Sequence, residues 1–327
     1  MKMNKNKEDL KIVYMGTPDF AVKPLKALVE DGYNIVGVVT MPDKRSGRGM
    51  KLQSSSVKQY ALSQNILVLQ PEKLKDPDFI EELKALHGDL QIVVAFRMLP
   101  EIVWRMPPMG TFNLHASLLP LYRGAAPINW AVMNGEKETG VTTFFLQKDI
   151  DTGDILLQEK IPISLDECAG SVHDRLMELG AKVVKDTVET ILDGTAEAKP
   201  QRYFVSKNGI NKTAPKLFKE NTRINWSLSC RELHDFVRGL SPFPAAWSEL
   251  HSIAGDIIGM KIFETCYDVV SHDLEPGTLV TDSKSELKVA VKDGYLILRK
   301  IQLAGKKALP TDEFLRGFSK ISDFFFI

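Results

Sequence analysis

The chain has 327 residues, enough for two domains of ordinary size. Its residues are 44% hydrophobic and 26% charged, as in globular proteins, and no stretch approaches the ~18 uncharged apolar residues of a membrane span. Lys plus Arg and Asp plus Glu both total 42, so overall charge does not indicate a nucleic-acid partner. The three cysteines lack metal-ligand spacing. The polar N-terminus lacks the apolar segment of a secretory signal, and we expect a cytoplasmic protein with no membrane partner.

The first elements alternate between strand and helix. Residues 11–15 form a β-branched and aromatic run that breaks at Gly16, residues 18–32 have helical spacing, and residues 34–40 form a second apolar run. This order predicts a parallel α/β sheet of Rossmann-like type. Only one glycine precedes the first helix, so the GxGxxG fingerprint of a dinucleotide site is absent.

A segment rich in Gly, Ser and positive charge follows at residues 41–56. Residues 41–51 contain four basic side chains and one acidic side chain, Asp43, which gives a net charge of +3. The segment has two interpretations, a solvated surface loop or an arm that closes on an anionic partner. The four cations are Lys44, Arg45, Arg48 and Lys51.

Two predicted strands, residues 90–96 and the FNLHASLLP run from Phe112, are adjacent in this sheet, so we expect their carboxyl ends to converge on one cleft. In open parallel sheets, ligands bind outside the carboxyl ends of the strands. Asn113 and His115 are two apart on one strand and therefore project from the same face, which predicts a catalytic pair. Arg97, beyond the other strand, could hold an anion or pair with a surface carboxylate.

The turn Asp151-Thr152-Gly153-Asp154 separates two β-like runs. An Asp beside a glycine most often caps its own backbone, and the alternative is that Asp151 orients the histidine of a neighbouring strand. Residues 164–193 then form a long helical region that we expect to be interrupted at Gly180.

The domain boundary is predicted in a segment poor in aliphatic residues. We expect a first domain at 1–193, a linker at 194–213 and a second domain at 214–327. The second domain has a Ser-capped helix, a Pro-rich corner and short, regularly spaced strands, which predict a small β-barrel, with an oligonucleotide-binding type as one option. Its 15 basic and 15 acidic residues balance, so any nucleic-acid contact depends on local clusters.

Several motifs together resemble the methionyl-tRNA formyltransferase family, over about residues 11 to 320. The run INWSLSCRELHDFVRGLSPFPAAW at 224–247 resembles the C-terminal domain of that family. The N-terminal motifs are GTPDF at 16–20, GRGMKL at 47–52, VVAF at 93–96, FNLHASLLPLYRGAAPINWAV at 112–132, NGEKETGVT at 134–142 and DTGDI at 151–155.

The resemblance implies transfer of a formyl group from the co-substrate 10-formyltetrahydrofolate to the amino group of initiator methionyl-tRNA. The catalytic Asn, His and Asp of the family fall on Asn113, His115 and Asp151. An Asn amide supplies a donor to the charge that develops on the formyl oxygen, and a His can take or give a proton. No metal is required, since the formyl group is already activated on the folate nitrogen.

The resemblance also implies binding residues, and we expect a monomer. The basic residues Arg48, Lys44, Arg45 and Lys51 would contact tRNA, and a recess at residues 17–20 would hold methionine. The chain departs from the family at residues 96–98, where many members have an aromatic residue followed by glycine. The folate pocket would be lined by Ser117, Leu118, Leu119, Pro120, Phe96, Arg97 and Met98.

Three rival interpretations remain open. A sugar-nucleotide formyltransferase is similar around NLHASLLP but lacks the GRG-containing loop and this C-terminal β domain. A glycinamide ribonucleotide formyltransferase shares the Asn, His and Asp but is a shorter single domain. A non-catalytic RNA-binding protein would use the barrel alone, and the intact set Asn113, His115 and Asp151 weighs against it.

Overall fold

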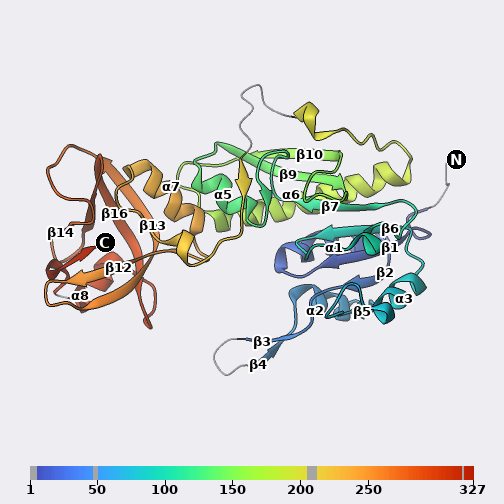
Figure 1. Ribbon diagram of the computed structural model, residues 1–327, viewed down its shortest axis with the longest axis horizontal. Helices are drawn as coiled ribbons and strands as arrows, with labels where there is room; N and C mark the ends of the chain where they lie inside the picture. The colour runs from blue at the N-terminus through green and yellow to red at the C-terminus, as the bar shows by residue number, and fades with distance from the viewer. Residues whose placement is uncertain (1–5, 47–50, 205–211, 319) are drawn as a thin grey trace. The chain divides into compact units, whose positions relative to one another are not determined.

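The computed structural model describes residues 6–46, 51–204, 212–318 and 320–327 (Figure 1). By internal contacts the chain divides into two compact units. The first unit comprises Met1–Gly124, Thr139–Ile161 and His173–Lys212, and the second comprises Ala125–Glu138, Pro162–Val172 and Thr213–Ile327. Residues 125–138 and 162–172 thus group with the second unit, and the domain bounds at 193 and 214 stay a prediction. In the described parts of the chain, no helix is long and apolar enough to cross a membrane.

A seven-stranded sheet organises the first unit. Its strands β7, β6, β1, β2 and β5 are parallel, and β9 pairs with β7 in the antiparallel sense. The predicted Rossmann-like sheet is confirmed. The strands in spatial order are β10 (Ile155–Pro162), β9 (Glu138–Phe145), β7 (Thr111–His115), β6 (Leu90–Val94), β1 (Lys11–Gly16), β2 (Asn34–Val39) and β5 (Val68–Leu69).

Helices α2 and α3 begin at capping side chains that the sequence supplies. The Ser55 hydroxyl accepts a hydrogen bond from the Lys58 amide at the start of α2, and the Asp76 carboxylate accepts one from the Asp78 amide at the start of α3. Apolar residues of α3 and α4 pack on one face of β1 and β6. The helical elements are η1 (Asp19–Ala21), α1 (Val22–Glu30), α2 (Ser56–Ser63), α3 (Pro77–Ala85), α4 (Glu101–Trp104), α6 (Ala169–Leu192) and η2 (Gln201–Phe204).

Helix α6 runs without a break through Gly180, so the predicted interruption is wrong. A Cβ atom at Gly180 would lie 2.8 Å from the Leu114 side chain on β7. The glycine is therefore used for close packing of helix on strand, which offsets its poor helix propensity of about 1 kcal/mol relative to Ala.

The basic segment forms a hairpin where we expected a loop. Strands β3 (Lys44–Ser46) and β4 (Lys51–Gln53) pair in the antiparallel sense. At its base, the Lys58 ammonium donates to Asp43 at 2.7 Å and, with Gln70, holds the pKa of that carboxyl below its usual value. Strands of three residues are too short to show an alternating pattern, which is why the sequence did not indicate them.

The second unit contains a strongly curved antiparallel sheet. Its strands run in the order β14-β15-β16-β13-β12-β18, and β17 pairs with β16. The Phe326 amide donates to the Gly277 carbonyl at 2.9 Å, which brings the two ends of the sheet together and nearly closes a barrel. The predicted barrel is confirmed. Its strands are β12 (Ala246–Ser252), β13 (Ile257–Val269), β14 (Leu279–Thr281), β15 (Leu287–Val291), β16 (Gly294–Leu303), β17 (Leu309–Pro310) and β18 (Phe324–Phe326).

Helix α7 (Cys230–Leu240) begins with the predicted serine cap. Ser229 and Glu232 form a capping box, in which the serine hydroxyl accepts from the Glu232 amide while the glutamate accepts from the Ser229 amide. The remaining elements are β8 (Arg123–Gly124), α5 (Pro127–Met133), β11 (Thr213–Ala214), η3 (Glu220–Thr222), α8 (Thr311–Gly317) and η4 (Ile321–Asp323).

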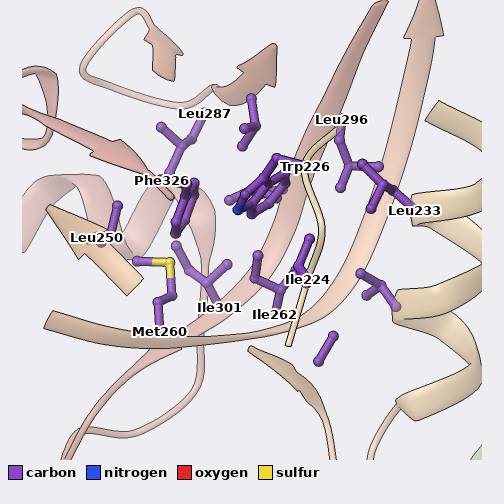
Figure 2. Close-up of a cluster of buried hydrophobic side chains, with 14 of the residues drawn as sticks. Ile224, Trp226, Leu233, Leu250, Met260, Ile262, Leu287, Leu296, Ile301 and Phe326 are labelled. Atoms are coloured by element: carbon purple, nitrogen blue, oxygen red, sulfur yellow. The ribbon is translucent and has the colours of Figure 1, made fainter. Parts of the chain in front are cut away.

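The barrel core is a cluster of buried apolar side chains (Figure 2). The Trp226 ring stacks on Phe326 with the ring centroids 4.6 Å apart. Its indole nitrogen donates to the Ser248 hydroxyl at 3.0 Å, so burial of the ring leaves no unpaired donor.

Candidate active site

The carboxyl ends of β1, β6 and β7 meet at one edge of the first sheet. The chain leaves β1 toward β2 and β5, and later adds β6 and β7 on the other side of β1, so the strand order reverses between β1 and β6. Such a switch point is where open α/β sheets bind ligands. In the register, Asn113 on β7 lies beside Val93 on β6 and opposite Phe144 on β9.

Asn113 presents an amide that is available to a ligand. Its side chain is partly exposed, and it forms no side-chain hydrogen bond with any residue that the structure describes. Alternation along β7 places Asn113 and His115 on the same face, with Leu114 on the other.

His115 is almost fully buried, with 7% of its side chain exposed. Its Nε2 atom lies 2.9 Å from the carbonyl oxygen of Tyr122. Since a carbonyl can only accept, Nε2 carries the proton and donates it. The other ring nitrogen, Nδ1, lies 3.8 Å from Oδ2 of Asp151, so it is the basic nitrogen of the neutral ring and has a carboxylate beside it.

Asp151 reaches His115 from the turn between β9 and β10. Its backbone has a φ of 53°, a left-handed conformation that Asp tolerates better than most residues. The Gly124 amide donates to its Oδ2 atom at 2.9 Å, so the carboxylate is anchored. The structure therefore brings Asn113, His115 and Asp151 together, while their catalytic roles stay a proposal.

The SLLP turn after β7 is fixed by Thr142 of β9. The Thr142 hydroxyl donates to the Ser117 carbonyl at 2.6 Å and accepts from the Leu119 amide at 3.2 Å. Ser117 and Leu119 are buried, and Leu118 and Pro120 are partly exposed. Only part of this predicted folate-binding segment thus presents side chains toward the surface.

Arg97, which follows β6, has its guanidinium held by backbone carbonyls of residues 71 and 72. Nη1 donates to Glu72 at 2.7 Å and Nη2 donates to Pro71. Burial lowers the pKa of this guanidinium. Its Nε atom is buried and has no hydrogen-bond partner among the described residues, and the same holds for the Thr17 hydroxyl, which follows β1. Phe96 lies under the guanidinium, and Met98 is 71% exposed.

Comparison with known proteins identifies the family. A family model described as formyl transferase matches residues 10–188, and a second, described as the C-terminal domain of formyl transferase, matches residues 216–319. A methionyl-tRNA formyltransferase of Bacteroides thetaiotaomicron is 59% identical over 317 residues, which are 97% of this chain and 98% of the relative. The chain belongs to the methionyl-tRNA formyltransferase family. A relative with this name in Porphyromonas gingivalis is 46% identical over 98% of this chain and 99% of its own length.

Solved structures more distant in sequence share the formyltransferase fold. HypX from Aquifex aeolicus in complex with tetrahydrofolic acid has a TM-score of 0.61 at 19% identity, over 94% of this chain and 47% of its own chain. An N-formyltransferase from Helicobacter canadensis, in complex with folinic acid and dTDP-3-aminofucose, has a TM-score of 0.61 at 19% identity, over 88% of this chain and 98% of its own.

The basic residues that the formyltransferase resemblance assigned to tRNA are placed only in part. Lys44 and Arg45 are exposed on β3, and the backbone of Lys51 lies on β4. Arg48 lies outside the described residues. Among the described residues, no group of three or more His, Cys, Asp or Glu side chains could hold a metal ion.

Sequence reasoning missed three groups at this formyltransferase site. They are the Tyr122 carbonyl, the Gly124 amide and the side chain of Gln201, which donates to the carbonyls of Asp151 and Gly153. Two are backbone atoms and carry no side-chain signal. Gln201 is 50 positions beyond Asp151, and only the fold brings the two together.

A cavity of about 830 Å³ lies in the second unit. Its lining includes three aromatic residues, Phe218, Phe243 and Trp247, together with Lys219 and Lys261. Phe243 is 80% exposed, and the Lys219 ammonium lies 4.7 Å from the centroid of the Trp247 ring.

Proposed function

We propose that this chain transfers the formyl group of 10-formyltetrahydrofolate to the amino group of methionine on initiator tRNA. The observation that carries the proposal is the set Asn113, His115 and Asp151 at the switch point of a formyltransferase sheet. It is supported by relatives named methionyl-tRNA formyltransferase that match nearly the whole chain.

The residues beyond β1 and β6 suit a polar ligand of pterin type. The Arg97 Nε atom and the Thr17 hydroxyl are buried without a partner among the described residues, and each would gain a hydrogen bond from a ligand there. Residues 96–98 and the turn at 117–120 would hold the folate. The bound folate supplies a formyl group already activated on nitrogen.

The three polar side chains then have separate roles in formyl transfer. The Asn113 amide donates to the formyl oxygen as negative charge develops on it, a contact that costs ~10²- to 10³-fold in rate when removed from comparable sites. His115 keeps Nε2 bound to Tyr122 and takes the proton of the attacking amine at Nδ1. It would return this proton to the leaving folate nitrogen as the bond between that nitrogen and the formyl carbon breaks. Asp151, 3.8 Å from Nδ1, stabilises the resulting imidazolium.

The tRNA would contact basic residues of both units. In the first unit we assign this contact to Lys44, Arg45, Arg48 and Lys51, and in the second unit to the cavity beside Phe243, which residues 214–327 line in large part. Aromatic rings near lysine ammonium groups suit stacked bases and adjacent phosphates. We further propose that the enzyme acts in the cytoplasm as a monomer.

The test offers the purified protein 10-formyltetrahydrofolate, radiolabelled in the formyl group, with three separate acceptors. They are methionyl initiator tRNA, an amino-sugar nucleotide and glycinamide ribonucleotide. We expect label on the aminoacyl-tRNA alone, and much less of it when Asp151→Asn replaces the wild type at equal concentration and time. Label on either small acceptor in preference to tRNA would overturn the substrate assignment.

A matched pair of variants tests whether the cavity contributes to tRNA binding, as distinct from any exposed apolar side chain. Phe243→Ala should raise KM for tRNA several-fold while KM for folate stays constant. Ile253→Ala removes an equally exposed apolar side chain, 85% exposed, elsewhere on the same unit and should change neither. Equal KM values in the two variants would remove the cavity from the tRNA assignment.

A further inference from the structure

Gln201 lies at the start of η2, just after the long helix, and is 5% exposed. Its Nε2 atom donates to the Asp151 carbonyl at 2.8 Å and to the Gly153 carbonyl at 2.9 Å. Its Oε1 atom accepts from Nη2 and Nε of Arg123 at 2.5 and 3.2 Å. The two carbonyls can only accept and the guanidinium can only donate, so these partners distinguish the amide nitrogen of Gln201 from its amide oxygen.

These contacts close a ring of interactions around Asp151. The Gly124 amide holds the carboxylate of Asp151. The neighbouring Arg123 holds Gln201, which in turn holds the backbone of Asp151. The segment before Gln201 is fixed as well, because Ile155 and Lys199 exchange two backbone hydrogen bonds, each of 2.8 Å.

The turn at Asp151 needs such support. At a φ of 53°, Asp151 lies in the left-handed region, which residues other than glycine adopt at a cost in free energy. The carboxylate lies beside His115 only while this backbone conformation persists. The Gln201 amide fits the turn because it offers two donors to adjacent carbonyls and one acceptor to Arg123, a combination that only Gln or the shorter Asn provides.

We infer that Gln201 is a positioning residue, which keeps Asp151 beside His115 by bridging the Asp151 turn to Arg123. The inference rests on the proposed formyl transfer, and it concerns turnover rather than binding. Gln201 forms no hydrogen bond with His115 and would act on it through the Asp151 turn. Its removal therefore lowers kcat and leaves KM for folate and for tRNA near the wild-type values.

The experiment compares Gln201→Met with Gln91→Met. Gln91 on β6 is also buried, at 2% exposure, and accepts from the Thr111 hydroxyl at 3.0 Å at the opposite end of the strands. Both variants replace a buried amide by an apolar chain of similar size. We expect Gln201→Met to lower kcat by about 10- to 100-fold, as small misplacements of catalytic groups do, and Gln91→Met to leave kcat within about twofold of wild type.

A double-mutant cycle separates positioning from general destabilisation. In an Asp151→Asn background, Gln201→Met should lower single-turnover rates by less than about twofold, because residues that act as a unit are not additive. Gln201→Glu serves as a second variant if Gln201→Met does not fold. It keeps the partner for Arg123 but removes both amide donors, and it should also lower kcat.

Three results would overturn the inference. They are a kcat for Gln201→Met equal to that of Gln91→Met, an effect confined to KM, and an undiminished effect in the Asp151→Asn background. Each comparison is made with the acceptor that the wild-type enzyme formylates. If the wild-type enzyme formylates a different acceptor, the proposed substrate is refuted. The comparison of Gln201→Met with Gln91→Met can then be made with that other acceptor, so it tests the role of Gln201 independently.

Discussion

The Nε2 atom of His115 donates to the carbonyl oxygen of Tyr122 across 2.9 Å. This bond fixes the tautomer of the neutral ring and leaves Nδ1, on the Asp151 side, as the nitrogen that can accept a proton. Tyr122 itself has a φ of 60°, so an unusual backbone conformation turns its carbonyl toward the ring. The orientation of His115 thus depends on backbone as much as on a carboxylate.

Replacing His115 by glutamine separates the hydrogen bond to Tyr122 from proton transfer. A Gln amide reaches about as far as Nε2 and can still donate to the carbonyl, but it cannot take a proton. We expect His115→Gln to lower kcat by ~10²- to 10⁴-fold, the usual contribution of a general acid or base, with tRNA affinity near normal. His87→Gln, at an exposed site between α3 and the amino end of β6, is the control. Undiminished turnover would remove His115 from the chemistry.

Asn113→Asp tests the amide donor with almost no change in shape. The carboxylate removes both N–H donors and brings negative charge to the place where the formyl oxygen becomes negative. We expect a loss in kcat of at least ~10²-fold. Asn34→Asp makes the same change at the amino end of β2 and should leave kcat unaltered. Comparable losses in the two variants would contradict a direct role for Asn113.

The β3–β4 hairpin predicts salt-dependent use of tRNA. Removal of one phosphate contact should reduce the slope of log affinity against log salt by about 0.7 to 0.9. Arg48→Ala and Lys44→Ala, assayed as KM for methionyl-tRNA between low and high KCl, should each raise KM and flatten the slope. Lys75→Ala, an exposed lysine outside the hairpin, is the matched control. An unchanged slope in both variants would favour the interpretation of residues 41–56 as a solvated surface segment.

His234 of α7 predicts how stability depends on pH. Burial lowers the pKa of this ring, and its Nε2 lies 3.4 Å from Oδ1 of Asp166 without hydrogen-bond geometry. A folded-state pKa below the unfolded value near 6.5 means that the unfolded chain binds the proton more readily. The contribution of His234 to the free energy of unfolding is therefore complete above pH ~6.5 and is lost as the pH falls below that value. Scanning calorimetry from about pH 7.5 to 5.5 should show a smaller decrease in Tm for His234→Gln than for wild type; equal decreases would exclude His234 as the cause.

The α/β order and the candidate triad could be predicted because both depend on side-chain patterns. The apolar runs predicted the central strands, and the two-residue spacing of Asn113 and His115 placed them on one face. Asp151 required the turn between β9 and β10, and its proximity to His115 followed from the family motif rather than from spacing.

The rest depended on tertiary structure. The hairpin strands are too short for periodicity, and the carbonyl of Tyr122 belongs to the backbone, which every residue shares. Gly180 was misread because the helix-breaking tendency of glycine is visible in a sequence, whereas the nearness of Leu114 is not. The role of Gln201 could not be predicted, because the residues whose carbonyls it binds lie 48 and 50 positions away in the sequence.

The contact of Gly180 with Leu114 has a genetic consequence. Leu114 stands between Asn113 and His115 on β7, with its side chain on the opposite face, so α6 supports the strand from behind. A methyl group added at position 180 would push on that support without touching the reacting groups. Mutations that compensate for a destabilising substitution in β7 should accordingly arise on α6 around position 180. This position is remote from the side chains that line the candidate active site.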